Sequence, residues 1–239
     1  MIDCLYPCFK HWAEHGSVYI MSDPHFEDSD CKLMDKDWIS PEEQIAILKS
    51  LVHKSDTLII LGDVGNPEYF AQIKAHKVLI KGNHDAGSIN YLHNVVIKNF
   101  DIEKYSFEEV SEYMHKHYPK CKIDIGVGYH LSCAPFEFYM ARADNCLFDE
   151  VYEGALCISE KIILSHEPIN LPFMVNIHGH CHDGSRANDY SINVAANVIG
   201  YKPLSLGKLI KDGLVSKVPS IHRICIDNAT EKAKRRKRK

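Results

Sequence analysis

Short apolar runs recur along the chain and alternate with amphipathic stretches, most clearly in its first third. The runs at 17–21, 57–61 and 77–80 are rich in strand-forming residues and short enough for buried strands, and those at 161–164 and 174–177 follow the same pattern. Strands separated by helical stretches are typical of βαβ units, whose strands run parallel. The predicted fold class is therefore α/β.

Two helix starts lie between these strands. Ser40 is a predicted N-cap, Pro41 occupies the first helical turn and Glu43 completes a capping box. Apolar residues at helical spacing then extend this predicted helix over 41–54. Asn66, which a proline follows, predicts the start of a second helix in the same way.

A segment of different character lies at about 95–146, where nine of the 23 aromatic residues gather. Ser106 and Glu109 predict one helix through a second capping box, and a stretch punctuated by glycine and proline follows at 123–138. We expect an inserted subdomain within a single domain spanning 1–231. Its aromatic side chains form either a small core of their own or a cleft that stacks on a flat group such as a nucleobase. The nine are Phe100, Tyr105, Phe107, Tyr113, Tyr118, Tyr129, Phe136, Phe138 and Tyr139.

The net charge of −4 hides an asymmetry between the body of the chain and its end. Positions 232–239 hold seven basic residues in eight, so the remainder carries 21 basic against 32 acidic residues, or −11. A basic tail favours nucleic acid as a partner, whereas an acidic body repels a long polyanion. The tail is therefore interpreted as a nucleic-acid arm, a localisation signal or a solvated helix end.

Cysteine usage and hydropathy indicate a cytoplasmic protein without a membrane partner. The nine cysteines include no CxxC pair, and the N-terminus lacks the features of a signal peptide. A zinc finger is excluded because Cys133, Cys146 and Cys157 have no paired spacing with histidines. No apolar run approaches the ~18 residues of a membrane span.

Residue types that bind metals cluster directly after the five predicted strands. Any one of them alone is more typical of a turn or of an ordinary histidine. Because the carboxyl ends of strands open onto the ligand crevice of an α/β sheet, the five loops are expected to converge. Imidazole combined with carboxylate and amide oxygen suits manganese, iron or zinc and disfavours Ca²⁺. The residues are Asp23, His25, Asp63, Asn83, His84, Asp85, His166, His180 and His182.

In this order the residues resemble the signature of the calcineurin-like metallophosphoesterases, which consists of D-x-H, G-D, G-N-H-D/E, G/S-H and G-H-x-H blocks. The blocks here are Asp23-Pro24-His25, Gly62-Asp63, Gly82-Asn83-His84-Asp85, Ser165-His166 and Gly179-His180-Cys181-His182. The resemblance spans about residues 18–182 and leaves the aromatic insert and the tail uncovered. It implies a four-layer sandwich of two facing mixed β-sheets flanked by helices, with the insert near the active-site face.

The resemblance also implies a dinuclear centre of two divalent metal ions, with Mn²⁺ expected and iron, Zn²⁺ or Ni²⁺ as alternatives. Asp63 would bridge the ions, a metal-bound hydroxide would attack phosphorus, and His84 would act as the general acid. One ion would be held by Asp23, His25, Asp63 and His182, and the other by Asp63, Asn83, His166 and His180.

The function implied is hydrolysis of phosphoric esters, with a phosphodiesterase favoured over a monoesterase. A nuclease acting on DNA or RNA is the alternative, because the tail and the aromatic insert favour nucleic acid. A further alternative is a non-catalytic metal-binding scaffold. Scaffolds of this kind are expected to lose ligand residues, and none is missing here.

One position departs from the pattern. Many members of the family carry an aspartate three residues after the bridging one, where it orients the acid histidine, and this chain has Asn66. Asn66 either supports His84 or simply caps the helix that follows. Asp85 is expected beside the centre and not as a ligand, and His178 and Cys181 are expected outside it.

Overall fold

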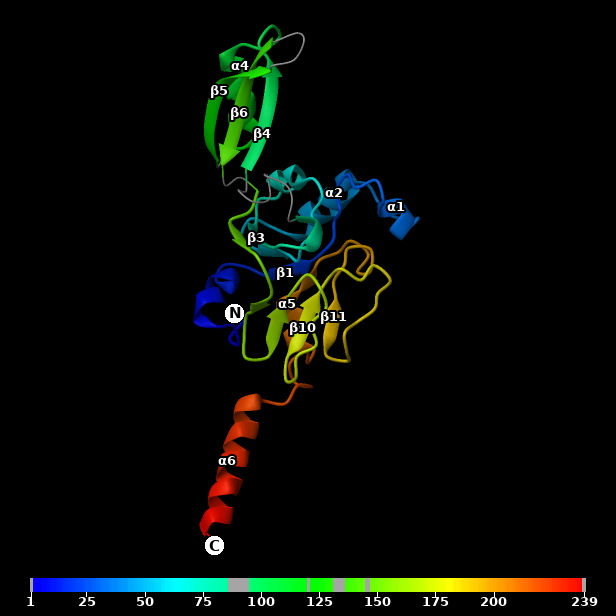
Figure 1. The fold of residues 1–239 in the computed structure, drawn as a ribbon, viewed down its shortest axis with the longest axis vertical. Helices are drawn as coiled ribbons and strands as arrows, with labels where there is room; N and C mark the ends of the chain where they lie inside the picture. The colour runs from blue at the N-terminus through cyan, green and yellow to red at the C-terminus, as the bar shows by residue number, and fades with distance from the viewer. Residues whose placement is uncertain (1, 86–94, 120, 131–135, 145–146, 238–239) are drawn as a thin grey trace.

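The computed structural model describes residues 2–85, 95–119, 121–130, 136–144 and 147–237. Its largest sheet has five strands in the order β12-β1-β2-β3-β7 (Figure 1). The pairs β1–β2 and β2–β3 are parallel, which confirms the βαβ prediction, and β12 is antiparallel to β1. The strands are β1 Val18–Met21, β2 Thr57–Ile60, β3 His76–Ile80, β7 Glu150–Tyr152 and β12 Leu204–Ser205.

A second sheet has four strands in the order β11-β10-β9-β8. Here β9, β10 and β11 are parallel, and β8 is antiparallel to β9. The two predicted strands at 161–164 and 174–177 are thereby confirmed within a residue or two. The strands are β8 Leu156–Cys157, β9 Ile162–Leu164, β10 Val175–His178 and β11 Ser191–Asn193.

The two sheets share one buried apolar core. Ile20 and Ile59 of the first sheet belong to the same cluster as Leu164 and Ile177 of the second. Along a strand, alternate side chains point to opposite faces, so Leu58 and Ile60 join a different cluster, together with Leu48 of α2 (Pro41–Leu51). The protein is a mixed α/β structure with layered sheets flanked by helices.

The helix α2 begins as its sequence predicts. Ser40 Oγ accepts the N–H of Glu43 at 3.2 Å, and the Glu43 carboxylate accepts the N–H of Ser40 at 2.9 Å. The helix ends at Leu51, three residues earlier than predicted, because Val52 is extended with φ −108°. The second predicted helix also begins after Asn66, but as the 3-10 helix η2 (Pro67–Gln72).

The aromatic segment forms an antiparallel sheet of its own, in the order β4-β6-β5. The capping box of Ser106 and Glu109 starts α4 (Phe107–His117) as predicted, and α4 buries Val110 and Met114 against this sheet. The strands, which are β4 Val95–Asp101, β5 Lys122–His130 and β6 Phe136–Asp144, were not predicted. Glycines in β5 resembled turn residues, yet Gly128 lies under the ring of Phe138, where a Cβ would approach Phe138 Cζ to 2.6 Å.

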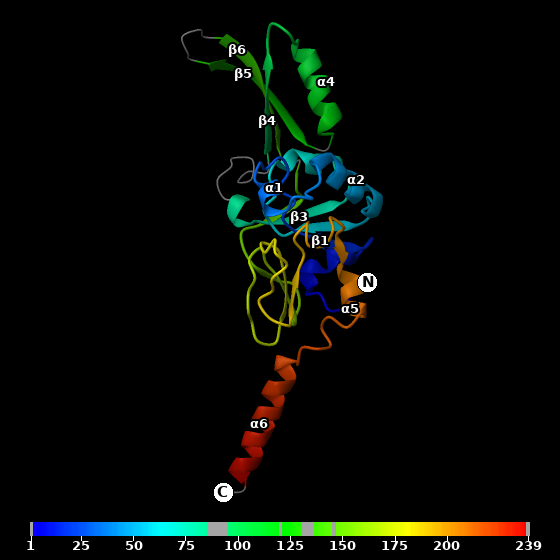
Figure 2. The same cartoon turned by 90° about the vertical axis from the view of Figure 1, so that its right-hand side faces the viewer.

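The remaining helices are four short ones in the body of the molecule and one long one at the C-terminal end of the described chain. The short helices η1 (Pro7–Ala13), α1 (Cys31–Met34) and η3 (Asn83–Asp85) and the helix α5 (Leu206–Lys211) belong to the body. The last helix, α6 (Ile221–Lys237), projects away from it, at the opposite end of the molecule from the β4-β6-β5 sheet (Figures 1 and 2). Within the described part of the chain, no helix is both long and apolar enough to span a membrane.

Candidate metal centre

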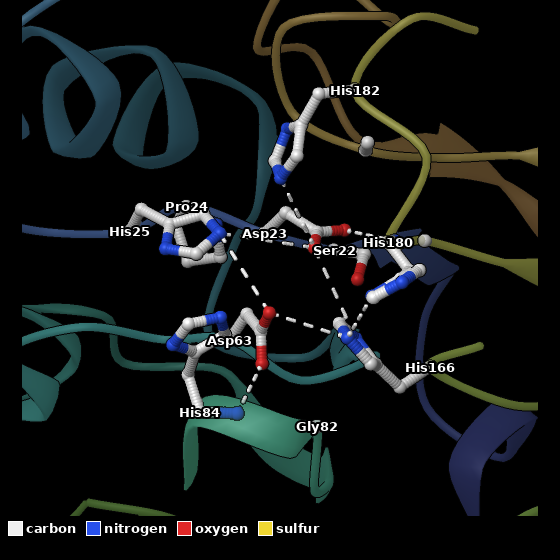
Figure 3. Close-up of polar contacts among 12 residues, drawn as sticks. Ser22, Asp23, Pro24, His25, Asp63, Gly82, His84, His166, His180 and His182 are labelled. Carbon is white, nitrogen blue, oxygen red and sulfur yellow. Dashed lines mark hydrogen bonds and ion pairs between the residues drawn. The ribbon is translucent and has the colours of Figure 1, made fainter. Parts of the chain in front are cut away.

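Five loops meet where the parallel strands of the two sheets end. Asp23 and Asp63 follow β1 and β2, His84 follows β3, and His166 and His180 follow β9 and β10. The ends of the two sheets are joined here, because Ser22 forms a parallel bridge with Ala195. Figure 3 shows the side chains pointing toward one another, with His25 and His84 on one side and His166 and His180 on the other.

The first group of ligand atoms comes from Asp23, His25 and His182. Asp23 Oδ1 lies 4.0 Å from His25 Nε2 and 3.8 Å from His182 Nε2. The carboxylate is fully buried, and its other oxygen, Oδ2, accepts the backbone N–H of His180 at 2.9 Å. This group therefore offers one carboxylate oxygen and two imidazole nitrogens to a shared point.

The second group comes from Asp63, His166 and His180, with Asn83 beside it. His166 Nε2 lies 3.2 Å from Asp63 Oδ2, 3.2 Å from His180 Nδ1 and 2.8 Å from Asn83 Oδ1. Asp63 Oδ2 also lies 3.8 Å from His25 Nε2 of the first group. A single carboxylate oxygen thus faces both groups, as a bridging ligand requires.

Two atoms of the first group are buried without a hydrogen-bond partner in the described structure, namely Asp23 Oδ1 and His25 Nε2. A buried polar atom without a partner costs about 1–3 kcal/mol. Both atoms face the point that the group shares, and a divalent cation there would satisfy both. The donor set of imidazole, carboxylate and amide oxygen suits first-row transition ions. The residues present therefore fit the dinuclear centre that the family resemblance implies.

The backbone at the site adopts conformations that L-residues rarely take. Asp23, His25, Asp63 and His180 have φ of 56°, 42°, 51° and 66°. Left-handed conformations at residues other than glycine cost energy and concentrate at functional sites. Gly179 adds a steric requirement, because a Cβ there would overlap Ser22 Oγ and Asp23 Oδ2.

The charges of the site shift the pKa values of its members. Burial alone raises the pKa of Asp63, but the hydrogen bond and charge of His166 outweigh it and hold the pKa below its ordinary value. Burial alone lowers the pKa of His166, but the hydrogen bond to Asp63 and the charges of Asp23 and Asp63 raise it to about 9. Burial dominates for His25, whose pKa lies below its usual value.

Each of three histidines is oriented by a partner on its other ring nitrogen. His25 Nδ1 lies 3.1 Å from Asp28 Oδ2, and His182 Nδ1 lies 3.2 Å from Asn197 Oδ1. His166 Nδ1 bonds the Leu61 carbonyl at 2.8 Å. Such outer partners fix which nitrogen faces a metal. Asp28 and Asn197 were not predicted; a carboxylate three residues after His25 is a usable signal for Asp28, whereas nothing in the sequence marks Asn197.

Asp85 lies behind Asp63 and binds the backbone of the loops. Its Oδ2 accepts the N–H groups of Asp63 at 2.9 Å and Gly82 at 2.8 Å, and its Oδ1 accepts that of Val64 at 3.1 Å. Burial raises the pKa of Asp85, while these N–H groups act in the opposite direction. Asp85 therefore holds the backbone around Asp63 in place, and neither group of ligand atoms found among the described residues includes it.

Asn66 caps η2, which is one of its two predicted roles. Its Oδ1 accepts the N–H of Glu68 at 3.1 Å, and its Nδ2 donates to Glu27 Oε2 at 2.7 Å. No hydrogen bond joins Asn66 to His84 among the described residues, so support of His84 is not what this side chain provides. His84 is exposed; its backbone N–H donates to Asp63 Oδ1 at 3.0 Å, and its ring centre lies 5.7 Å from that of His25.

Some nearby features lie outside the centre. Within the described ranges, neither group of ligand atoms includes His178 or Cys181. His178 is buried and its Nδ1 bonds the Gly179 carbonyl at 2.8 Å. A cavity of about 1040 Å³ between η2 and α4 contains none of the predicted ligands. Cys133 and Cys146, which bear on the excluded zinc finger, lie outside the described residues.

Comparisons with known proteins leave the function open. No protein-family model matches the chain, and no curated protein matches it. Among solved structures, the chain is similar to a protein of unknown function, AQ665 from Aquifex aeolicus, with 20% identity and a TM-score of 0.45. The match covers 82% of this chain and 98% of that chain. A likeness at this level carries no conclusion about the fold or the function of this chain.

Proposed function

We propose that this protein is a metal-dependent hydrolase of phosphoric esters, acting on diesters in preference to monoesters, with the four-layer fold of the metallophosphoesterases. One observation carries the proposal: Asp63 Oδ2 lies 3.2 Å from His166 Nε2 and 3.8 Å from His25 Nε2, between two groups of ligand atoms. The arrangement has the shape of a dinuclear site that shares one carboxylate. The parallel strands of two sheets sharing one core support the fold assignment.

The ligand groups divide between two divalent ions. Asp23, His25 and His182 would hold one ion, with Asn83, His166 and His180 on the other, and Asp63 would serve both. When bound, such ions would supply an activated water as the nucleophile and would neutralise charge on the phosphate oxygens. Mn²⁺ is the expected ion, with iron, Zn²⁺ or Ni²⁺ as alternatives.

The chain itself supplies the proton for the leaving group. His84 is exposed beside His25, and its backbone is tied to Asp63, so its imidazole stands at the mouth of the centre. An imidazole there can protonate a departing oxygen near neutral pH. Asn66 bonds Glu27 and the backbone of Glu68 instead, and among the described residues no carboxylate is paired with the His84 imidazole. Esters whose leaving group needs little protonation are therefore the expected substrates.

The test is hydrolysis of bis(p-nitrophenyl) phosphate by the purified protein with Mn²⁺. We expect turnover by the wild type and by His222→Ala, a control on exposed α6, and none by Asp63→Asn or His166→Ala. Circular dichroism establishes that the inactive variants are folded. Absence of turnover with Mn²⁺, Fe²⁺, Ni²⁺ and Zn²⁺, on diesters and monoesters alike, would overturn the proposal and favour a metal-binding scaffold.

A nuclease is a second candidate, favoured by the position of α6. This helix is exposed along almost its whole described length and ends in the run of basic residues. A projecting basic helix provides contacts for the phosphates of a polynucleotide. Incubation with single-stranded DNA and RNA under the same conditions, followed by analysis of the fragments, separates a nuclease from an esterase limited to small diesters.

A further inference from the structure

A second cluster of metal-binding side chains lies at the opposite edge of the five-stranded sheet. His76 begins β3 and Glu150 begins β7, whereas the candidate metal centre lies beyond the carboxyl ends of the strands. His11 joins them from η1. Glu150 Oε1 lies 2.7 Å from His11 Nε2 and 2.6 Å from His76 Nε2, so three ligand atoms from three separate elements converge.

The carboxylate of Glu150 is oriented independently of the two histidines. The Trp12 indole N–H donates to Oε1 at 2.8 Å, and the Tyr152 hydroxyl donates to Oε2 at 2.6 Å. Burial alone raises the pKa of Glu150, but these bonds and those of the histidines outweigh it and hold the pKa at about 2. Glu150 is therefore an ionised oxygen ligand, and the hydrogen bonds from Trp12 and Tyr152 set its direction.

The two histidines turn the same ring nitrogen toward Glu150, and His76 has a second carboxylate beside its other ring nitrogen. Both present Nε2 to Glu150, and His76 Nδ1 faces the Asp149 carboxylate, 3.8 Å from Oδ2. A carboxylate behind the outer nitrogen is a common arrangement around metal-bound imidazole. The side chains of His11 and His76 are 46% and 36% exposed, so an ion can enter from solvent and keep a water as a further ligand.

We propose that His11, His76 and Glu150 form a mononuclear site for a first-row transition ion such as Zn²⁺. Two imidazole nitrogens, one carboxylate oxygen and one open position match the ligand set of three-residue zinc sites. Tetrahedral ligands at ~2.0–2.1 Å from zinc lie about 3.3 Å apart, so the Nε2–Oε1 separations of 2.7 and 2.6 Å would widen by about 0.6 and about 0.7 Å on binding. Each neutral imidazole then carries its proton on Nδ1.

The expected consequence is a clamp between the N-terminal segment and the sheet. His11 belongs to η1, which packs Phe9 and Trp12 into the core shared by the two sheets. The other two ligands lie on neighbouring parallel strands, as β3 pairs with β7. An ion at this point would tie the first 13 residues to a sheet edge that begins more than 60 residues later in the chain.

Metal content tests the proposal without reference to catalysis. The protein is stripped with chelator, equilibrated with Zn²⁺, desalted and analysed by mass spectrometry for zinc per chain. We expect His11→Gln and His76→Gln each to hold one ion fewer than the wild type. The control is His15→Gln, an exposed histidine in the same segment, which is expected to match the wild type. The comparison is a difference, so it is independent of how many ions the candidate metal centre retains.

Tryptophan fluorescence gives a second readout because the chain has two tryptophans, one at each site. Trp12 bonds Glu150, whereas the Trp38 ring centre lies 5.9 Å from that of His25 and 5.6 Å from that of His182. In Trp38→Phe protein, Cu²⁺ is expected to quench Trp12 saturably, and His76→Gln in that background is expected to abolish the saturable phase. The proposal is wrong if the wild type and both site variants hold equal zinc per chain, or if His76→Gln leaves the quenching unchanged. The three side chains would then interact through hydrogen bonds and bind no metal.

Discussion

The carboxylate of Asp85 accepts the backbone N–H of Asp63. Asp85 thereby holds in place the residue whose own carboxylate faces both groups of ligand atoms. Asp85→Ala would leave the N–H groups of Asp63, Val64 and Gly82 without this acceptor. Because each unsatisfied buried donor costs about 1–3 kcal/mol, we expect the variant to lose at least about 3 kcal/mol of unfolding free energy. Urea denaturation measures the loss, and Asp85→Asn, which keeps an acceptor, is expected to lose less.

The substitution should also disturb the metal centre, because the Asp85 carboxylate helps to hold Asp63 in its left-handed backbone conformation. We expect Asp85→Ala to bind metal more weakly even at temperatures where it is folded. A variant with wild-type stability and wild-type metal content would show that Asp85 has no positioning role.

The convergence of most candidate ligands could be predicted because these residues follow strands that are easy to recognise. Asp23, Asp63 and His166 come directly after short apolar runs, and parallel strands bring such positions to one edge. The role of Asn66 was ambiguous, because asparagine before proline is an ordinary cap as well as a motif position. The structure shows the cap, because Asn66 Oδ1 accepts the N–H of Glu68.

The parts that sequence reasoning missed depend on contacts between distant segments. Asn197 reaches His182 from the loop after β11, and Glu150, on the strand that pairs with β3, is met by His11 across 139 positions. Neither contact leaves a periodic trace in the sequence. The β4-β6-β5 sheet was missed for a local reason, since the glycines that admit the Phe138 ring also look like turn residues.

Close approach of the backbone at Gly179 is a second testable requirement of the site. A Cβ there would overlap the carboxylate of Asp23 and the hydroxyl of Ser22, so Gly179→Ala must push the first ligand group apart. We expect a loss of about 1–3 kcal/mol of stability, typical of overpacking, together with loss of metal from that group. Gly154→Ala is the matched control, since nothing lies within 4 Å of its added Cβ. Equal metal content in the two variants would contradict the geometry.

Metal removal is expected to destabilise the protein. Asp23 Oδ1 and His25 Nε2 are buried without partners in the described structure, so an ion held between them binds the folded state and not the unfolded one. At a free concentration 100 times its Kd, such an ion adds about 2.7 kcal/mol to the free energy of unfolding. Thermal denaturation with Mn²⁺ and with chelator measures the difference. In Asp23→Asn the increment is expected to fall by half or more; an unchanged increment would place the ion elsewhere.

Cys31 is expected to resist alkylation although it lies near the centre. Burial, followed by the charges of Asp28 and Asp30, raises the pKa of its thiol to about 12, and its Sγ faces the His25 carbonyl. Since the thiolate is the reactive form, iodoacetamide at pH 8 should modify exposed Cys157 and Cys225 well before Cys31. Peptide mass spectrometry over time gives the three rates. Labelling of Cys31 as fast as that of Cys157 would contradict this environment.

The same shift predicts how stability responds to alkali. The folded pKa of Cys31 lies above the ordinary value of 9.0, so the folded state holds the proton more tightly than the unfolded chain does. Its contribution is complete below about pH 9 and is lost as the pH rises from there towards 12. Cys31→Ala is expected to flatten the decline of the urea midpoint over that interval.

Deletion of residues 221–239 separates the two candidate functions. The side chains at 221–235 are exposed, apart from a half-buried Ile224, so the free energy of unfolding of the truncated protein is expected to lie within about 0.5 kcal/mol of that of the full chain. Hydrolysis of a small diester should be unchanged, because α6 projects away from the body (Figure 1) and contributes no residue to the ligand groups found among the described residues. If the enzyme is a nuclease that uses the basic run, affinity for single-stranded oligonucleotides falls, and the salt slope of binding shrinks by about 0.7 for each phosphate that the tail no longer neutralises.

A variant with glutamine at the basic positions of 232–239 keeps the helix and should reproduce the effect of the deletion. Unchanged oligonucleotide binding and cleavage in both variants would exclude the tail from substrate recognition and leave the small-diester esterase as the better assignment.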